Sequence, residues 1–112
     1  MAAYDQEAFH SLIDGDQDLF AELYQLYSTD WPQLLKGIED AQKAGQAPEV
    51  ERLAHRLKGM TRNFFATSTA DLCGEVEELA RVQNLKDIPQ HLGPLYKSLQ
   101  QLDDELRENL KI

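Results

Sequence analysis

A histidine followed closely by a lysine and a glycine is the part of this sequence best suited to chemistry. His55 lies in the segment LAHRLKGMTR at residues 53–62. At the roughly 100° per residue of an α-helix, Lys58 and Gly59 share the face of His55 one turn further on. The opposite face is an apolar stripe of Val50, Leu53, Ala54, Leu57, Thr61 and Phe64. An imidazole on the exposed face is a nucleophile that a partner can reach, because much of it is neutral near pH 7.

Gly59 is an unusual residue for the interior of a helix, where glycine costs about 1 kcal/mol relative to alanine. The missing Cβ beside His55 leaves room for a bulky group on the imidazole. Lys58 places a cation close to the same space. A nucleophilic nitrogen, a cation and open space together favour a phosphoryl group as the ligand.

The residues Ala54-His55-Arg56-Leu57-Lys58-Gly59 resemble the motif of histidine-containing phosphotransfer (HPt) domains, and the helical pattern of nearly the whole chain is similar to theirs. The resemblance implies that His55 is phosphorylated, that Lys58 is the partner of the phosphate and that Gly59 provides clearance. Members of the family commonly carry Leu-Gly-Ala soon after the motif, whereas this chain has Phe64-Phe65-Ala66.

The function that the resemblance implies is that of a phosphorelay intermediate in two-component signalling. His55 would accept a phosphoryl group from a receiver-domain aspartate and pass it to another. The partners would be receiver domains of response regulators and a hybrid sensor histidine kinase. No ATP site is visible, so we expect a phosphocarrier rather than an enzyme, with no cofactor of its own and with Mg²⁺ in the receiver. The alternative is a non-phosphorylated helical adaptor that binds a signalling partner.

Basic residues gather around His55 in a chain whose net charge is −9. The nineteen residues from Arg52 to Ala70 contain no Asp or Glu but hold four of the eleven Lys and Arg residues. We expect Lys58, joined by Arg62, to offset the phosphoryl charge. The candidate partner-docking residues are Arg52, Arg56, Arg62 and Phe65. The acidic balance of the whole chain argues against nucleic acid as a partner.

Length and composition favour one globular domain that covers residues 1–112, with 42% apolar residues. The single cysteine, Cys73, excludes an internal disulfide and fits a reducing compartment. No apolar run approaches the ~20 residues of a membrane span, and the N-terminal residues lack the pattern of a signal peptide. We therefore expect a cytoplasmic protein without a membrane segment.

Apolar residues recur at spacings of three and four throughout, which indicates an all-α fold. The pattern predicts helices at residues 4–13, 18–27, 31–44, 48–65, about 69–84 and 87–106. Residues 28–30 separate the second helix from the third, and Thr69 or Ser68 and then Asp87 are expected N-caps. We predict an antiparallel four-helix bundle with one or two short N-terminal cap helices. Because no large apolar face is left over, we expect a monomer.

Other residue types that carry chemistry have simpler interpretations. His10 and His91 have no partner at metal-ligand spacing, so we expect no metal site. Cys73 is interpreted as a small buried residue. One helix carries a run of glutamates that we interpret as a solvated face, namely Glu75, Glu77 and Glu78. No glycine-rich phosphate loop, serine elbow or pair of carboxylates is present.

Overall fold

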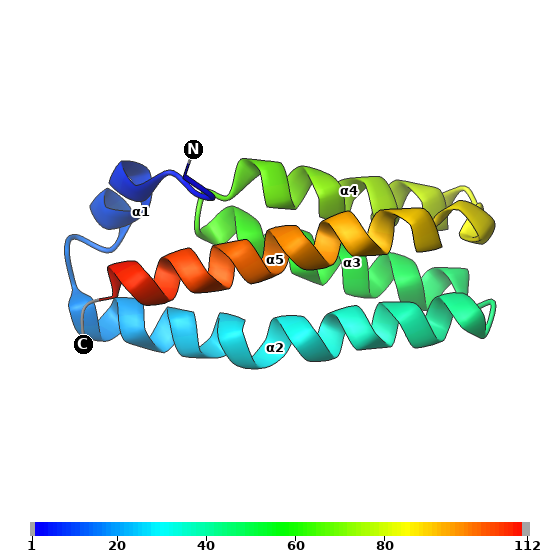
Figure 1. Cartoon of the computed structure of the whole chain (residues 1–112), viewed down its shortest axis with the longest axis horizontal. Coiled ribbons are helices and arrows are strands. Elements are labelled where there is room, and N and C mark those ends of the chain that lie inside the picture. The colour runs from blue at the N-terminus through cyan, green and yellow to red at the C-terminus, as the bar shows by residue number, and fades with distance from the viewer. Residues whose placement is uncertain (1, 111–112) are drawn as a thin grey trace.

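The computed structural model of the chain describes residues 2–110, and every regular element in that range is helical. The elements are α1 (Gln6–Leu12), α2 (Gln17–Lys43), α3 (Ala47–Asn63), α4 (Thr67–Arg81), the short 3-10 helix η1 (Leu85–Asp87) and α5 (Pro89–Asn109). Helices α2 to α5 lie side by side as an antiparallel four-helix bundle, and α1 lies at one end of it (Figure 1). The predicted fold class is confirmed, with one cap helix.

Helix α2 is longer than predicted, because it joins the expected second and third helices into 27 residues. At about 1.5 Å per residue it is roughly 40 Å long, close to the 43 Å length of the molecule. The first helix of the bundle therefore begins at Gln17, and only α1 caps the end.

The predicted break at residues 28–30 is wrong because the apolar stripe continues through it in register. Tyr27, Trp31, Leu34 and Ile38 are all buried at helical spacing on either side of the three polar residues. Pro32 lies inside the helix, where it removes one backbone hydrogen bond. Burial of the continuous stripe outweighs that loss, whereas a polar triplet alone supplies no force that would end the helix.

Two predicted N-caps are also wrong. Helix α4 begins at Thr67 without a side-chain cap, and Thr69 is buried with its hydroxyl 2.7 Å from that of Ser98. The Asp87 carboxylate accepts a hydrogen bond from Asn84 rather than from the start of α5, which Pro89 opens. The sequence places these polar residues near the helix ends, but it does not show which group forms a hydrogen bond with each of them.

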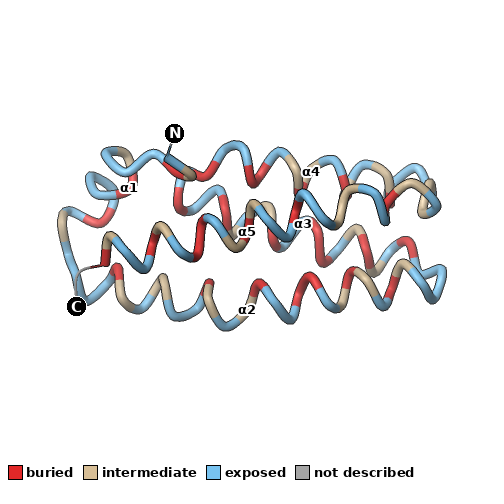
Figure 2. Tube along the Cα trace, in the orientation of Figure 1, coloured by how far each residue is buried: buried red, intermediate tan, exposed pale blue. Residues whose placement is uncertain are grey.

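The core runs along the axis of the bundle, where each helix turns its buried face inward (Figure 2). Helix α1 closes one end with Phe9, whose ring lies 5.0 Å from that of Phe20 and 5.1 Å from that of Phe64 between ring centroids. Phe64 ends α3, so the cap helix also contacts the helix that carries His55.

A buried carboxylate joins α2 to α5. The side chain of Asp103 accepts hydrogen bonds from the Tyr24 hydroxyl at 2.7 Å and from the Trp31 indole N–H at 2.8 Å. The hydroxyl of Tyr27, between them, donates to the backbone carbonyl of Leu99 at 2.8 Å. These directional bonds fix the register of the two helices in a way that apolar contacts alone do not.

Replacing Asp103 with alanine leaves two donors without an acceptor, one of them on the buried Trp31. We expect Asp103→Ala to lower the free energy of unfolding by about 2–3 kcal/mol. Asp104→Ala, which removes an exposed carboxylate, is the matched control and should change stability by less than about 0.5 kcal/mol. Denaturant unfolding measures both, and equal losses would show that Asp103 does not hold the helices together.

Candidate functional site

His55 lies midway along α3 with its side chain 69% exposed. Every residue of the predicted apolar stripe is buried, so α3 has the predicted orientation: Val50, Leu53, Ala54, Leu57, Thr61 and Phe64. The imidazole consequently stands on the open side of the helix, where it can meet another molecule.

Glu77 of α4 holds both His55 and Lys58. Its carboxylate lies 2.7 Å from His55 Nδ1 through Oε2, and its Oε1 accepts a hydrogen bond from Lys58 Nζ. The Glu77 side chain is only 16% exposed. The interpretation of this glutamate as part of a solvated face is therefore wrong, and it is the site residue that sequence reasoning missed.

Glu77 reaches α3 because it lies at the edge of the buried stripe of α4. Cys73, one turn earlier, and Val76 are fully buried, and α3 and α4 pack more extensively than any other pair of described helices. Gly74 also faces α3, since a Cβ there would lie 3.6 Å from Lys58 Cδ. The spacing of Glu77 from Cys73 and Gly74 indicates that it lies near the buried face of its helix. The sequence alone does not show which helix packs against that face.

The charge of Glu77 determines which nitrogen of His55 is free. Burial raises the pKa of the Glu77 carboxyl, but hydrogen bonds from Lys58 and His55 lower it by more, so the pKa lies below its ordinary 4.5. The carboxylate is thus ionised near neutral pH and can only accept hydrogen bonds. His55 Nδ1 must then carry the proton, which leaves a lone pair on Nε2 of the neutral ring.

The other basic residues near His55 differ in how they are paired. The Arg52 guanidinium contacts Glu49 at 2.7 Å, and that of Arg56 lies 3.7 Å from Asp30 of α2. Arg62 is exposed and forms no ion pair with another described residue. Residues 52–70 contain no Asp or Glu, but in the folded protein they lie beside carboxylates. Helices α2 and α4 bring these carboxylates to them.

Gly59 leaves open space beside His55. A Cβ built on Gly59 meets no atom within 4 Å. The packing of the chain itself therefore does not require glycine at this position, although an exposed helical glycine is destabilising. The space at Gly59 is therefore open to another molecule.

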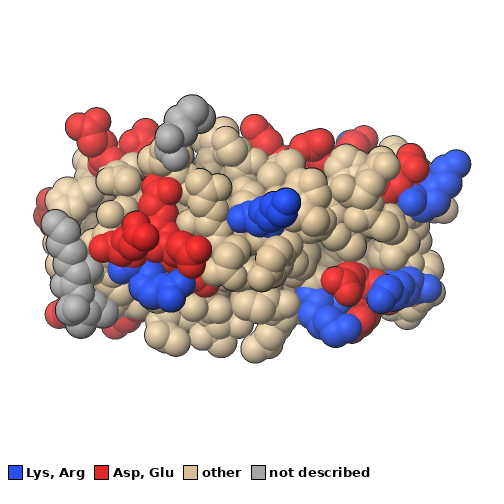
Figure 3. All heavy atoms as spheres, viewed as in Figure 1, with Lys and Arg blue, Asp and Glu red and all other residues tan. Residues whose placement is uncertain are grey.

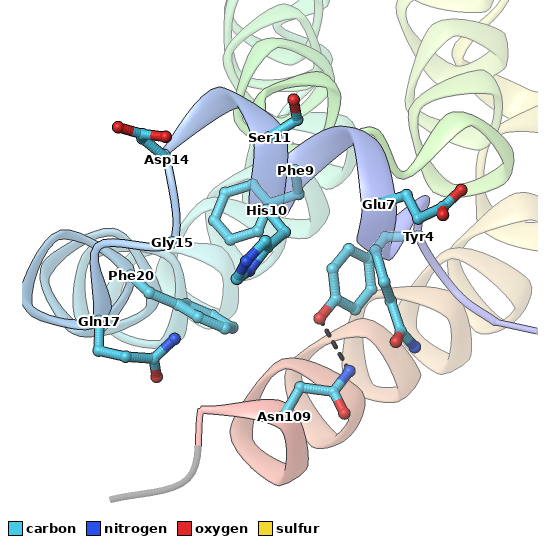
Figure 4. A pocket seen from close by; sticks show the side chains of 11 residues that line it. Tyr4, Glu7, Phe9, His10, Ser11, Asp14, Gly15, Gln17, Phe20 and Asn109 are labelled. Atoms are coloured by element: carbon cyan, nitrogen blue, oxygen red, sulfur yellow. Dashed lines mark hydrogen bonds between the residues drawn. The ribbon is translucent and has the colours of Figure 1, made fainter.

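A hollow of about 1010 Å³ lies away from His55. It lies at the capped end between α1, the start of α2 and the end of α5, where Tyr4 accepts a hydrogen bond from Asn109 (Figure 4). His10 lines it, and His91 lies 4.0 Å from Glu75 elsewhere. No group of three or more His, Cys, Asp or Glu side chains in residues 2–110 is arranged to hold a metal ion.

Three further features concern the cysteine thiol, the acidic surface and membrane-spanning helices. Cys73 is buried, as predicted, and burial raises the pKa of its thiol to about 12, so it is no nucleophile near neutral pH. Acidic side chains gather near the end where both termini lie, on the face that carries α5 (Figure 3). None of the described helices combines the length and the apolar character needed to cross a bilayer.

The depressed pKa of Glu77 predicts a pH-dependent contribution to stability. Its ionised form stabilises the fold above about pH 4.5, and this contribution is lost as the pH falls through the lower pKa of the folded protein. We expect Glu77→Gln to cost on the order of 1 kcal/mol at pH 7, and this cost, measured by denaturant unfolding, should shrink as the pH falls below about 4.5.

Glu78→Gln is the control for this measurement, because Glu78 pairs with the exposed Arg81 and is itself 53% exposed. It should change stability little at any pH. A cost of Glu77→Gln that does not decrease as the Glu77 carboxyl is titrated to its protonated form would contradict the ionised pairing.

Comparisons with known proteins identify the fold and the family of this chain. The model of the Hpt domain family matches residues 22–109. The structure is similar to the crystal structure of histidine-containing phosphotransfer protein B (HptB) from Pseudomonas aeruginosa PAO1, with a TM-score of 0.89 and 24% sequence identity over 97% of this chain and 95% of that one. No curated protein sequence matched the chain. Since the family model covers most of the chain, including the whole of α3 with His55, the protein belongs to the Hpt domain family.

Proposed function

We propose that His55 accepts a phosphoryl group on Nε2 from the aspartyl phosphate of one receiver domain and passes it to the aspartate of another. As a member of the Hpt family, the chain is a histidine phosphotransfer intermediate of phosphorelay signalling. The observation that carries the assignment to His55 is its geometry. The ring is 69% exposed, and its one hydrogen bond among residues 2–110 is that of Nδ1 with Glu77.

The transfer can be written with the residues of this chain. The Nε2 lone pair attacks phosphorus, the N–P bond forms, and the P–O bond to the aspartate breaks with release of its carboxylate. The proton on Nδ1 stays in the hydrogen bond to Glu77. The negative charge of Glu77 stabilises the positive charge that develops on the ring. Onward transfer is the same sequence in reverse.

Lys58 and Gly59 support this role in different ways. Lys58 Nζ is bound to the carboxylate that also holds His55, so its positive charge is kept close to the ring. There it can offset the charge of a phosphoryl group, and Arg62 adds a second cation two turns from His55. The space beside Gly59 gives an approaching receiver room to bring its aspartate in line with Nε2.

The remaining partners follow from the family. We propose receiver domains of response regulators and of a hybrid sensor histidine kinase as partners, with Mg²⁺ bound in the receiver. We propose no cofactor for this chain, which acts as a carrier rather than as an enzyme with an ATP site. A monomer in the cytoplasm is part of the same proposal, and the buried free Cys73 is compatible with a reducing compartment.

Substitution of His55 tests the assignment directly. A receiver domain phosphorylated with radiolabelled acetyl phosphate should transfer acid-labile label to the wild-type chain. We expect His55→Gln to reduce this labelling to background, because it removes the Nε2 nucleophile. Its fold should be retained, since the side chain is largely exposed; helical circular dichroism checks this.

His10→Gln and His91→Gln are the matched controls and should be labelled like the wild type. Label that persists in His55→Gln would place the phosphoryl group elsewhere. A wild-type chain that binds receivers but is never labelled would favour the helical adaptor.

A further inference from the structure

Helix α3 ends in a backbone conformation that usually selects glycine. Phe65 has a positive φ of 59°, its N–H donates to the carbonyl of Arg62 at 2.9 Å, and the N–H of Ala66 donates to that of Thr61 at 3.0 Å. This pair of bonds is the Schellman motif, whose left-handed residue is most often glycine because a Cβ crowds the backbone there. Helix α2 ends in the same motif with Gly45, at a φ of 74°.

The conformation of Phe65 is held from outside the helix as well. Its carbonyl accepts a hydrogen bond from the N–H of Asp5 at 3.1 Å, which ties the segment before α1 to the end of α3. Three backbone bonds thus fix a bulky residue in a region that favours glycine. Such strain persists where the surrounding structure enforces it, and it is frequent at functional positions.

The Phe65 side chain is not needed for the core. It is 37% exposed, whereas its neighbour Phe64 is 4% exposed and packs against Phe9 and Tyr27. An exposed aromatic ring at a strained position points to a contact with another molecule, because aromatic residues are enriched where partners bind.

Phe65 lies within reach of a partner that is docked on His55. Ten residues of helical rise separate the two, or roughly 15 Å. A standard interface covers about 800 Å² of each partner, which corresponds to a disc of about 16 Å radius. A receiver centred on His55 therefore reaches Phe65 at the rim of its footprint.

Charge also favours the half of α3 between His55 and Phe65. Towards the start of the helix, Arg52 is neutralised by Glu49. Towards its end, Arg62 is exposed and forms no ion pair among residues 2–110. A receiver that presents an acidic phosphorylation site is attracted to the unpaired cation.

We propose that Phe65 is an aromatic anchor for the receiver domain, which docks over the half of α3 from His55 to Phe65 with Arg62 between them. The proposal rests on the proposed function. It explains why a ring occupies a backbone position suited to glycine.

Phe65→Gly removes the ring and suits the backbone, so it tests the anchor without forcing the helix end to change. Transfer from a phosphorylated receiver is followed as a function of receiver concentration. We expect the concentration at half-maximal rate to rise about tenfold, while the rate at saturation changes less than twofold. Phe65→Tyr, which keeps the ring, should restore the wild-type value.

Gln83→Gly is the matched control, because Gln83 has the same φ of 59° in the same motif at the end of α4. Helix α4 ends at the opposite end of the bundle from the end of α3 (Figure 1). We expect the transfer kinetics of Gln83→Gly to equal those of the wild type.

An unchanged half-maximal concentration in Phe65→Gly would overturn the anchor, as would an equal rise in Gln83→Gly. In both cases labelling of the wild type at His55 would leave the proposed function intact. A wild-type chain that no receiver labels would instead overturn the function itself.

Discussion

One carboxylate determines how the site of this protein is arranged. Glu77 of α4 accepts from Nδ1 of His55 and from the ammonium of Lys58, both on α3. The contact orients the ring, keeps the proton on Nδ1 and leaves the lone pair of the neutral ring on Nε2. The same carboxylate holds the lysine close to the point where a phosphoryl group would arrive. Without it, His55 would be an ordinary exposed histidine with free rotation and two exchangeable tautomers.

The packing of the four helices keeps Glu77 and His55 in contact. Glu77 and His55 are 22 residues apart and meet only because α3 and α4 pack closely along their length. On the other side, the buried Asp103 joins Tyr24 and Trp31 of α2 to α5. Phe9 of α1 closes the end at which α3 stops. A rigid scaffold of this kind lets a single exposed ring be presented without a cavity around it.

The sequence predicts the orientation of a helix, which depends on the periodicity of its apolar residues. It does not predict which side chains pair between helices. The spacing of Leu53, Leu57 and Phe64 sufficed to place His55 on the open face, because the helical repeat sets direction. The polar triplet at residues 28–30 predicts a break in the helix, although the buried stripe through Tyr27 and Trp31 continues across it. Glu77 is interpreted from the sequence as a surface charge, and nothing in the sequence singles out Asp103, because a carboxylate at the edge of a stripe becomes a partner only when another helix lies opposite.

The central claim is that Nε2 of His55 carries the phosphoryl group while Nδ1 stays bound to Glu77. The most direct measurement is heteronuclear NMR of the isotope-labelled chain after phosphorylation by a receiver domain, which identifies the nitrogen coupled to phosphorus. The account predicts coupling to Nε2 of His55 and a proton on Nδ1. Phosphorus bonded to Nδ1, or to any other side chain, would contradict it.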